Sequence, residues 1–268
     1  MKHRRTASRQ YHDRVAGGYD AMYEGDPYWQ FYDEITWTHL RRFLPKNLGT
    51  VILDAGCGTG KWGLKLAKSG YRVILSDNST GMLERAAAKA EELGVAERVT
   101  IDRSDLADLG GITDGAVGMV VAQGDPLSLV SDARAAVRAM RRVLLPGGTA
   151  VCSVDNRWAG VDHYVEAGIF DDLDRFLRNG QTNWFTKREE ERFPVHMFWP
   201  DELVTLFEGN GFEVLEVVAK GCLVRDRNAA MVRDPELRRK LVRLELKLGR
   251  QPSALGRSSH LQIAARRR

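Results

Sequence analysis

The chain has 268 residues, of which 43% are hydrophobic and 28% are charged, and it carries a formal net charge of +4. This composition is typical of a globular protein with a full core, and no apolar run approaches the roughly 20 residues of a membrane-spanning helix. Much of the basic excess lies in residues 2–5, 238–240 and 266–268. Solvated ends and a solvated helix face explain such clusters more often than a nucleic-acid groove does, so nucleic-acid binding is not expected.

Cysteine usage and the first residues predict where the chain resides. Cys57, Cys152 and Cys222 are odd in number, and two of them fall in strand or loop positions that should be buried. The first residues are basic but lack the apolar stretch of a signal peptide. These features predict a reducing, cytoplasmic environment. The histidines and cysteines lack the spacing of metal ligands, so no metal site is predicted.

A glycine-rich loop at residues 54–60 is the most informative motif. Three apolar residues precede Asp54, and glycines follow at 56, 58 and 60. This pattern predicts a buried strand that enters a tight turn, with a helix over residues 61–68. Glycine is needed in such a turn because the backbone bends sharply and approaches a ligand closely. Asp54 would repel a diphosphate but can pair with a cationic group, which disfavours a dinucleotide.

Strand and helix signals alternate after this loop, which predicts a mostly parallel α/β sheet. Further strands are expected at residues 71–76, 99–101, 116–122, 149–154, 212–218 and 260–265. Further helices are expected at residues 80–93, 131–145, 200–208 and 234–249. Ser79 is placed to cap the first of these helices, and Gly94 is placed to end it. Residues 146–148, Pro-Gly-Gly, are expected to end the helix before the fifth strand.

The order of these features resembles the class I S-adenosylmethionine-dependent methyltransferases across residues 45–220. Residues 142–148, Arg-Val-Leu-Leu-Pro-Gly-Gly, are similar to a recurring phrase of that family, with Leu145 where lysine is usual. The resemblance implies a Rossmann-like, seven-stranded, mostly parallel sheet with helices on both faces and an antiparallel last strand. It implies a single domain with four parts: an N-terminal cap (1–45), a cofactor-binding core (46–156), a substrate or lid insertion (157–199) and a C-terminal part of the sheet (200–268).

The same resemblance implies that S-adenosylmethionine is the cofactor and that the glycine loop holds its methionine part. Gly56, Gly58 and Gly60 would wrap this part of the cofactor. Asp54 would help to hold the ammonium group, directly or through water. Asp77, about 20 residues beyond the loop, would accept hydrogen bonds from both ribose hydroxyls, as acids do in dinucleotide folds.

Residues after the next strands would hold the adenine and the amino-acid part of the cofactor. Asn78 follows Asp77, and Met82 would pack against the adenine ring or belong to the ordinary core. Asp105 would lie near the adenine amino group, and Leu106 would offer a backbone N–H to the ring edge. Gln123, after the fourth strand, would contact the amino-acid part of the cofactor.

The N-terminal segment is dense in aromatic residues. Residues 16–20, Ala-Gly-Gly-Tyr-Asp, resemble the opening of many small-molecule methyltransferases, in which this segment folds over the cofactor and the acceptor. Tyr11, Arg14 and Tyr19 are the predicted contacts to cofactor or substrate. Packing of an amphipathic helix is the alternative explanation for the aromatic side chains.

The acceptor should lie beside the insertion at residues 157–199, because this aromatic segment suits a lid over an organic molecule. Methyl transfer needs alignment, and it needs a base when the acceptor is protonated. His163, His196 and Asp125 are the candidate bases, although a structural role explains either histidine equally well. Asp125-Pro126 does not continue into the Asp-Pro-Pro-aromatic motif of exocyclic-amine methyltransferases.

The sequence therefore predicts a methyltransferase that transfers a methyl group to a small organic acceptor by direct in-line displacement. The expected form is a monomer or homodimer with no membrane and no nucleic-acid partner. The alternatives are an RNA or protein methyltransferase, an S-adenosylmethionine-binding regulatory protein without turnover, and a nicotinamide-dependent oxidoreductase. The motifs do not name the acceptor, nor do they separate O-, N-, C- and S-methylation.

Overall fold

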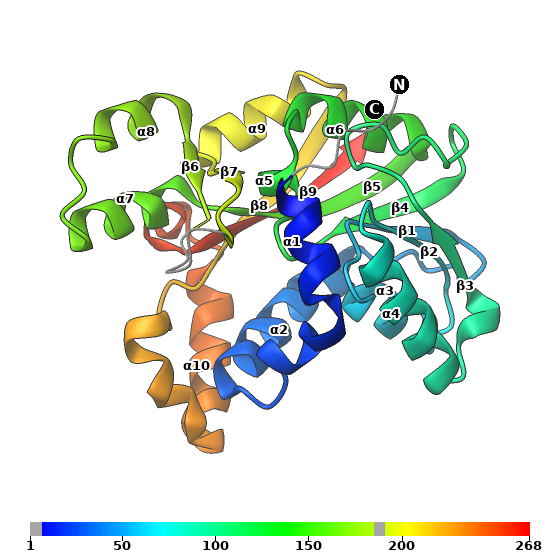
Figure 1. Ribbon diagram of the computed structural model, residues 1–268, viewed down its shortest axis with the longest axis horizontal. Coiled ribbons are helices and arrows are strands. Elements are labelled where there is room, and N and C mark those ends of the chain that lie inside the picture. The colour runs from blue at the N-terminus through cyan, green and yellow to red at the C-terminus, as the bar shows by residue number, and fades with distance from the viewer. Residues whose placement is uncertain (1–6, 185–190) are drawn as a thin grey trace.

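The structure, a computed structural model, describes residues 7–184 and 191–268 and is built around one twisted seven-stranded sheet (Figure 1). The strand order is β3-β2-β1-β4-β5-β9-β8, and β9 runs antiparallel to both of its neighbours, β5 and β8, while the other pairs are parallel. The strands of this sheet are β1 (Val51–Ala55), β2 (Arg72–Ser76), β3 (Val99–Asp102), β4 (Val117–Ala122), β5 (Leu144–Asp155), β8 (Phe212–Lys220) and β9 (His260–Arg267). The predicted fold is confirmed.

Helices cover both faces of the sheet because alternate strand residues point to opposite sides. Leu53 and Val120 pack with α6 and α9, whereas Ile52 and Val121 pack with α3 and α4. The helices of this core are α3 (Lys61–Lys68), α4 (Thr80–Glu92), α5 (Pro126–Leu129), α6 (Ala133–Val143) and α9 (Pro200–Glu208). Ser79 caps α4 as predicted, since its side chain accepts from the Met82 N–H.

One predicted helix end is wrong. The helix expected over residues 131–145 ends at Val143, and β5 begins at Leu144. Leu144 has an extended backbone, so residues 146–148 form the first part of the strand instead of ending the helix. The turn chemistry of Pro-Gly-Gly therefore acts within a long strand.

Additional segments surround the carboxyl edge of the parallel strands. The cap comprises α1 (Ala7–Val15), two short 3₁₀ turns and α2 (Pro27–Leu40), and α2 packs against α10 (Pro235–Leu248). The insertion forms α7 (Arg157–Glu166), α8 (Leu173–Asn179) and a small hairpin of β6 (Gln181–Asn183) and β7 (Pro194–His196). Figure 1 shows α7, α8 and this hairpin at one end of the sheet, with α1 and α2 across its front. Among the described helices, none is long and apolar enough to cross a membrane.

Candidate active site

A cavity of about 540 Å³ lies at the carboxyl edge of the parallel strands, where α/β proteins bind their ligands. The glycine loop and the ends of β2 and β4 form one side of it. Tyr11, Tyr19 and Trp29 of the cap line it, as do Trp184 and Phe193 of the insertion. The cavity therefore connects the predicted cofactor loop with both of the aromatic segments.

The glycine loop has the backbone geometry that its sequence predicts. Gly56, Gly58 and Gly60 have φ values of +72°, +54° and +83°, which other residues adopt only with strain. A Cβ on Gly58 would meet no atom within 4 Å, so the backbone there borders open space that a ligand can approach. A Cβ on Gly56 would lie only 2.5 Å from Cβ of Pro126. Glycine at this position therefore lets the loop pack against the start of α5.

Asp77 lines the cavity and also fixes the loop. Its Oδ2 accepts a hydrogen bond of 2.9 Å from the Gly58 N–H, and its Oδ1 accepts one of 2.8 Å from the Ser79 N–H. Burial raises the pKa of this carboxyl, while these backbone donors act in the opposite direction. A carboxylate has about four lone-pair sites, and the backbone donors here do not use all of them, so the residue can still accept from a ribose hydroxyl.

Asp54 lies behind the loop instead of in the cavity wall. It is fully buried, and its Oδ2 accepts a 2.7 Å hydrogen bond from the Gly63 N–H at the start of α3. Its Oδ1 has no hydrogen-bond partner within the described structure. Burial raises the pKa of this carboxyl to about 7. Its part in holding the cofactor ammonium group stays a prediction.

Polar contacts tie the cap to the cofactor loop. Asp20 accepts a 2.6 Å hydrogen bond from the Thr59 hydroxyl and one of 3.0 Å from Lys89 Nζ of α4. Asp13 of α1 accepts a 2.6 Å hydrogen bond from the Ser79 hydroxyl, which caps α4. The cap is thus fastened to the residues that would hold the cofactor.

The structure separates the predicted cofactor residues into two groups. Nine of them line the cavity: Tyr11, Tyr19, Gly56, Gly58, Asp77, Asn78, Asp105, Leu106 and Gln123. Four lie outside its lining: Arg14, Asp54, Gly60 and Met82. Met82 is fully buried in the core, and Arg14 lies 3.8 Å from Glu191 and over the Tyr11 ring.

The candidate bases separate in the same way. Asp125 lines the cavity, whereas neither His163 nor His196 is among the described residues that do so. His163 is half-buried on α7 beside the Tyr164 ring. His196 lies 2.8 Å from a Glu202 oxygen and 2.9 Å from the Gln181 amide nitrogen, so both of its ring nitrogens are engaged.

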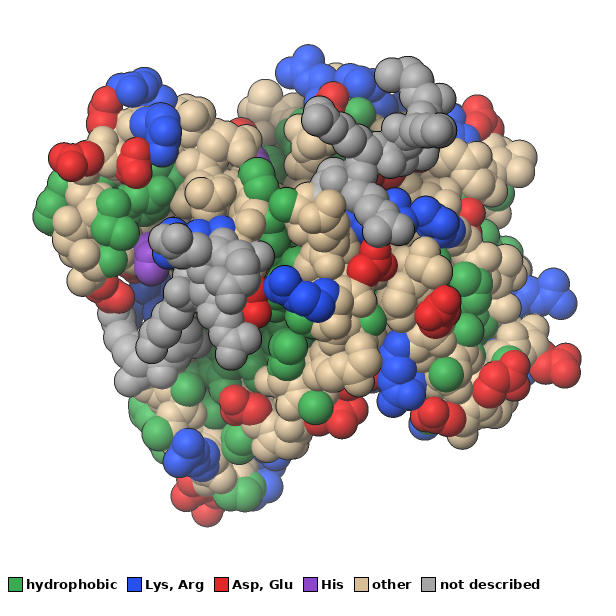
Figure 2. Space-filling view, in the orientation of Figure 1, with side chains coloured by type: hydrophobic (Ala, Val, Ile, Leu, Met, Phe, Trp, Pro, Cys, Tyr) green, Lys and Arg blue, Asp and Glu red, His purple; other side chains and the backbone are tan. Residues whose placement is uncertain are grey.

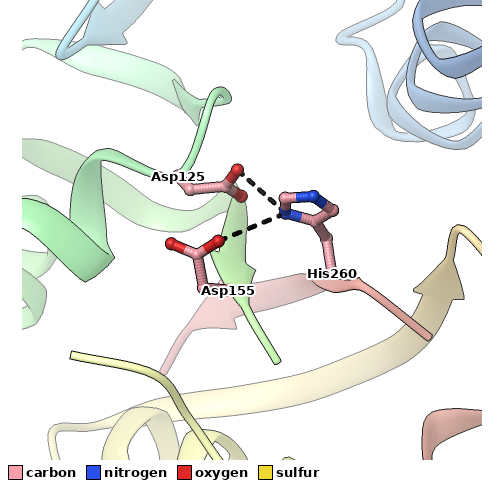
Figure 3. Close-up of side chains that lie close together, drawn as sticks. All are labelled: Asp125, Asp155 and His260. Carbon is pink, nitrogen blue, oxygen red and sulfur yellow. Dashed lines mark ion pairs between the residues drawn. The ribbon is translucent and has the colours of Figure 1, made fainter. Parts of the chain in front are cut away.

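A row of ionisable side chains, of which the sequence analysis named only Asp125, lies at the far end of the cavity. Asp155 ends β5, His260 begins β9 and Lys220 ends β8, and His260 pairs in register with both of the others. Because residues paired in this way share one face of a sheet, the three side chains stand side by side. Asp125, in the loop after β4, completes the group, and Figure 3 shows it with Asp155 and His260.

Within this group His260 lies between two carboxylates. Its Nδ1 is 3.1 Å from Asp125 Oδ2 and 3.6 Å from Asp155 Oδ1. Lys220 Nζ is fully buried, 3.3 Å from the Thr36 hydroxyl and 4.7 Å from the centre of the Tyr32 ring. Two acids and two bases therefore share one buried space.

Mutual charge decides the protonation of this group. Burial opposes the charge of His260, but the Asp125 carboxylate outweighs it and raises the pKa of His260 above its usual value. Burial likewise disfavours the Asp125 anion, yet His260 holds its pKa low. Burial and the neighbouring Asp125 raise the pKa of Asp155 to about 7, and burial lowers the pKa of Lys220 to about 8.

Asp125, Asp155 and His260 offer ligand atoms within 4.8 Å of one another, which is close enough for a cation. Lys220 already places a positive charge beside them. A bound metal would displace the His260 proton, so a divalent ion beside two carboxylates, a neutral imidazole and the Lys220 ammonium would leave one excess positive charge in a mostly enclosed place. The group is better described as a proton-holding network than as a metal centre.

A second hollow of about 730 Å³ lies at the opposite, amino edge of the sheet. It is lined by Arg138, Arg141, Arg142 and Arg267 beside residues 209–211. Arg142 pairs with Asp114 and donates to the Ile112 carbonyl, and Arg267 donates to the Leu144 carbonyl. These arginines join chain segments, and the glycine loop lies at the other edge, so the chemistry belongs to the first cavity.

Comparison with known proteins agrees with this geometry. The family model described as a methyltransferase domain matches residues 52–148. A tRNA 5-carboxymethoxyuridine methyltransferase of Escherichia coli O157:H7 is 27% identical over 207 residues, or 76% of each chain. A ubiquinone biosynthesis O-methyltransferase of Ruegeria pomeroyi is 31% identical over 173 residues, which cover 63% of this chain and 62% of that relative.

Solved structures extend the likeness to nearly the whole chain. An S-adenosylmethionine-dependent methyltransferase from Mesorhizobium loti superposes with a TM-score of 0.60 and 25% identity. The superposition covers 87% of this chain and 98% of that one. The sheet order, the glycine loop and the family match together define an enzyme that transfers methyl groups. The chain has the fold of the class I S-adenosylmethionine-dependent methyltransferases, its residues 52–148 match a methyltransferase domain, and S-adenosylmethionine is its cofactor.

Proposed function

We propose that this methyltransferase acts on a small organic acceptor, held between the aromatic cap and the row of ionisable side chains. The observation that carries the proposal is the continuity of one cavity from the glycine loop, through Tyr19 and Trp29, to Asp125 and His260. Cofactor and acceptor must share such a space, because direct transfer requires the nucleophile to lie in line with the methyl carbon.

The walls of the cavity suit a flat organic molecule. Trp184 and Phe193 are stacked with ring centres 5.7 Å apart and an interplanar angle of 9°. Tyr11 lies 5.4 Å from Phe193, so the cap and the insertion meet through aromatic rings. Aromatic surfaces with a few fixed polar groups are typical of sites for small ligands.

The visible surface supports the same proposal. Figure 2 shows the acidic and basic side chains of the described residues interspersed over this face, and these residues form no continuous basic tract on it. Nucleic-acid binding depends mainly on such a tract, because phosphate contacts supply most of the affinity. A small acceptor requires no surface of this kind.

Cofactor binding and product analysis test this proposal. We expect calorimetry to show S-adenosylmethionine binding and no NADH binding. Incubation with the cofactor and a fractionated metabolite extract should release S-adenosylhomocysteine and a methylated small molecule. Asp77→Ala is the negative control. It removes the carboxylate that fixes Gly58 and should abolish both cofactor binding and release of S-adenosylhomocysteine. Tight cofactor binding with no product from any fraction would instead indicate a regulatory protein without turnover.

An RNA acceptor is the second candidate, and two observations favour it. The E. coli relative is named for tRNA. In addition, Arg239, Lys240, Arg243 and Lys247 are exposed on one face of α10, which also carries Glu236 in its first turn. If RNA is the acceptor, tRNA should bind with an affinity that falls steeply with salt, and the RNA fraction should become methylated.

A further inference from the structure

His260 is held in an orientation that leaves one ring nitrogen for a ligand. Its Nδ1 is turned toward Asp125 and Asp155, and the other nitrogen lies on the far side of the ring (Figure 3). Both neighbours of Nδ1 are carboxylates, so their charge favours a hydrogen on Nδ1. The contacts are ion-pair distances, since Nδ1 is itself among the buried atoms without a hydrogen-bond partner in the described structure. His260 lines the cavity, and Nε2 is not among the buried atoms of the described structure that lack a partner.

Asp125 is held in place by its backbone. Its φ is +62°, in the left-handed region, which few non-glycine residues adopt although aspartate does so more readily than most. The N–H groups of Gly124 and Asp125 each donate a 3.1 Å hydrogen bond to the Ser153 hydroxyl. A strained residue kept by specific contacts at a cavity wall points to a functional requirement for its side chain.

We propose that His260 is the general base of methyl transfer, that Asp125 positions it, and that the acceptor is therefore a hydroxyl of a phenol or an enol. This inference rests on the proposed function, because it names the acceptor class for the same cavity. A ring-bearing acceptor matches the aromatic walls. An ionised carboxylate or a neutral amine would attack without prior loss of a proton, so the Asp125–His260 pair would have no task.

The proton and electrons balance in a single step. S-adenosylmethionine supplies an electrophilic methyl carbon and leaves as neutral S-adenosylhomocysteine. His260 Nε2 accepts the hydroxyl proton as the acceptor oxygen forms its bond to the methyl carbon. The carbon–sulfur bond breaks, and its electron pair goes to sulfur. The Asp125 carboxylate stabilises the imidazolium, which then releases its proton to water.

Charged groups from every neighbouring element act on His260. Asp125 and Asp155 favour its protonated form, and Lys220 opposes it. Tyr32 of α2 lies edge-on to the imidazole with ring centres 5.2 Å apart, and Asp33 of α2 acts on Lys220. Since the carboxylates prevail, the pKa of His260 is raised, and the ring loses its proton at higher pH than an ordinary histidine does. Activity should then rise with pH as the imidazole becomes a free base.

The protonation of His260 can be measured without turnover. In ¹⁵N-imidazole NMR spectra of the cofactor-free protein, the signals that disappear in His260→Gln identify this ring. We expect a neutral form with hydrogen on Nδ1 and a bare Nε2. Asp125→Asn should lower the pKa of His260, because it removes the nearest negative charge. A neutral ring with hydrogen on Nε2, or a pKa that does not respond to Asp125→Asn, would overturn the proposal.

Kinetics with a panel of acceptors test the base and the acceptor class together. The panel contains phenols, enols, amines, thiols and carboxylic acids, and release of S-adenosylhomocysteine is followed from pH 5.5 to 9. We expect turnover with hydroxyl acceptors, an acid limb in the pH profile, and a loss of about 100-fold or more in His260→Gln. In Asp125→Asn the limb should move to lower pH and the plateau should fall. Asp174→Asn, whose partner Arg178 is also exposed, is the matched Asp-to-Asn control and should retain activity.

Cofactor affinity and product analysis distinguish failure of the His260 assignment from failure of the proposed function. If His260→Gln binds the cofactor but turns over hydroxyl acceptors within about threefold of the wild type, the base assignment is wrong. Preference for amines, thiols or carboxylates, or a requirement for an added divalent cation, would also overturn it. If no small molecule in the panel or the extract is methylated by the wild type, the proposed function itself fails, whatever the NMR spectra show.

Discussion

The two halves of the cavity are built in different ways. In the cofactor half, residues 54–77 supply the glycine loop, Asp77 and the strand ends, and the contacts are mostly backbone N–H groups with carboxylates. In the acceptor half, Asp125, Asp155, Lys220 and His260 come from four distant segments and meet through the sheet register. The first half is a property of local sequence, and the second is a property of topology.

This difference also changes how each half depends on protonation. The cofactor half contains two buried carboxyls whose pKa values are raised chiefly by burial. The acceptor half contains acids and bases that offset one another. Changes in the cofactor half should therefore act on folding and cofactor affinity, whereas changes in the acceptor half should act on turnover and its pH profile.

The largest expected effect concerns Asp54. Its folded-state pKa of about 7 exceeds the unfolded value of 3.8, so its stabilising contribution is complete below pH 3.8 and is lost as pH rises toward 7. Between those limits the free energy of unfolding of the wild type should fall by about 4 kcal/mol relative to Asp54→Asn. Denaturant unfolding of the cofactor-free proteins at pH 4 to 8 measures this difference.

Asp114→Asn is the control for this comparison because Asp114 is exposed beside Arg142. Its difference from the wild type should not change over the same pH range. A pH-independent difference for Asp54→Asn as well would mean that Asp54 is ionised in the folded protein, and the contrast between the halves would then be lost.

The cofactor half could be predicted because its signals lie close together in the chain. Asp54 lies near the end of β1, Asp77 and Gln123 directly follow β2 and β4, and the carboxyl ends of parallel strands meet at one edge. The sequence did not show whether each side chain points into the cavity. The Asp54 side chain turns toward Gly63 instead, and Met82 is buried in the core. Such orientations depend on packing between elements, which periodicity does not encode.

The next expected effect concerns two nearby glycines, Gly58 in the loop and Gly63 in the helix α3 that follows it. A Cβ on Gly63 would lie 2.1 Å from Leu75 Cδ2 and 2.9 Å from Asp54 Oδ2. Gly63→Ala should therefore lower the free energy of unfolding by about 2–3 kcal/mol. Gly58→Ala meets open space and should cost only about 1 kcal/mol of backbone strain.

Cofactor affinity should rank the two variants in the opposite order. The Gly58→Ala methyl group borders the cavity, whereas the Gly63→Ala methyl group is buried between α3 and the sheet. Denaturant unfolding and calorimetry with S-adenosylhomocysteine measure both quantities. Equal losses of affinity would mean that the loop moves as a unit with α3.

Apart from Asp125, which was among the candidate bases, the acceptor half escaped prediction for a topological reason. Asp155 ends a parallel strand and could have been found by the rule that identified Asp77. His260 begins a strand, and only the antiparallel direction of β9 brings a first residue to the carboxyl edge. His163 and His196 were favoured because they lie in the aromatic insertion, yet proximity in sequence did not bring them to the cavity lining.

A smaller effect is expected where the cap meets the cofactor half. Asp20→Asn keeps an acceptor for the Thr59 hydroxyl but loses the charge that pairs with Lys89. The affinity for S-adenosylmethionine should fall by about threefold to fivefold, since a partly exposed ion pair contributes up to about 1 kcal/mol. Calorimetry measures this, with Asp174→Asn as control. An unchanged affinity would show that the cap is not coupled to the loop.

The smallest effect is expected on α10, and its size tests whether the acceptor half ends at the cavity. Lys240, Arg243 and Lys247 are exposed, so replacing all three with glutamate should leave methylation of a small acceptor within about twofold. A tRNA acceptor predicts the opposite result. Each lost phosphate contact would reduce the slope of log affinity against log salt by about 0.9, and methylation of RNA would fall with it. Loss of turnover in this triple variant would therefore move acceptor recognition from the aromatic cavity to the outer face of α10, and His260 would then act on a group that a nucleic acid presents.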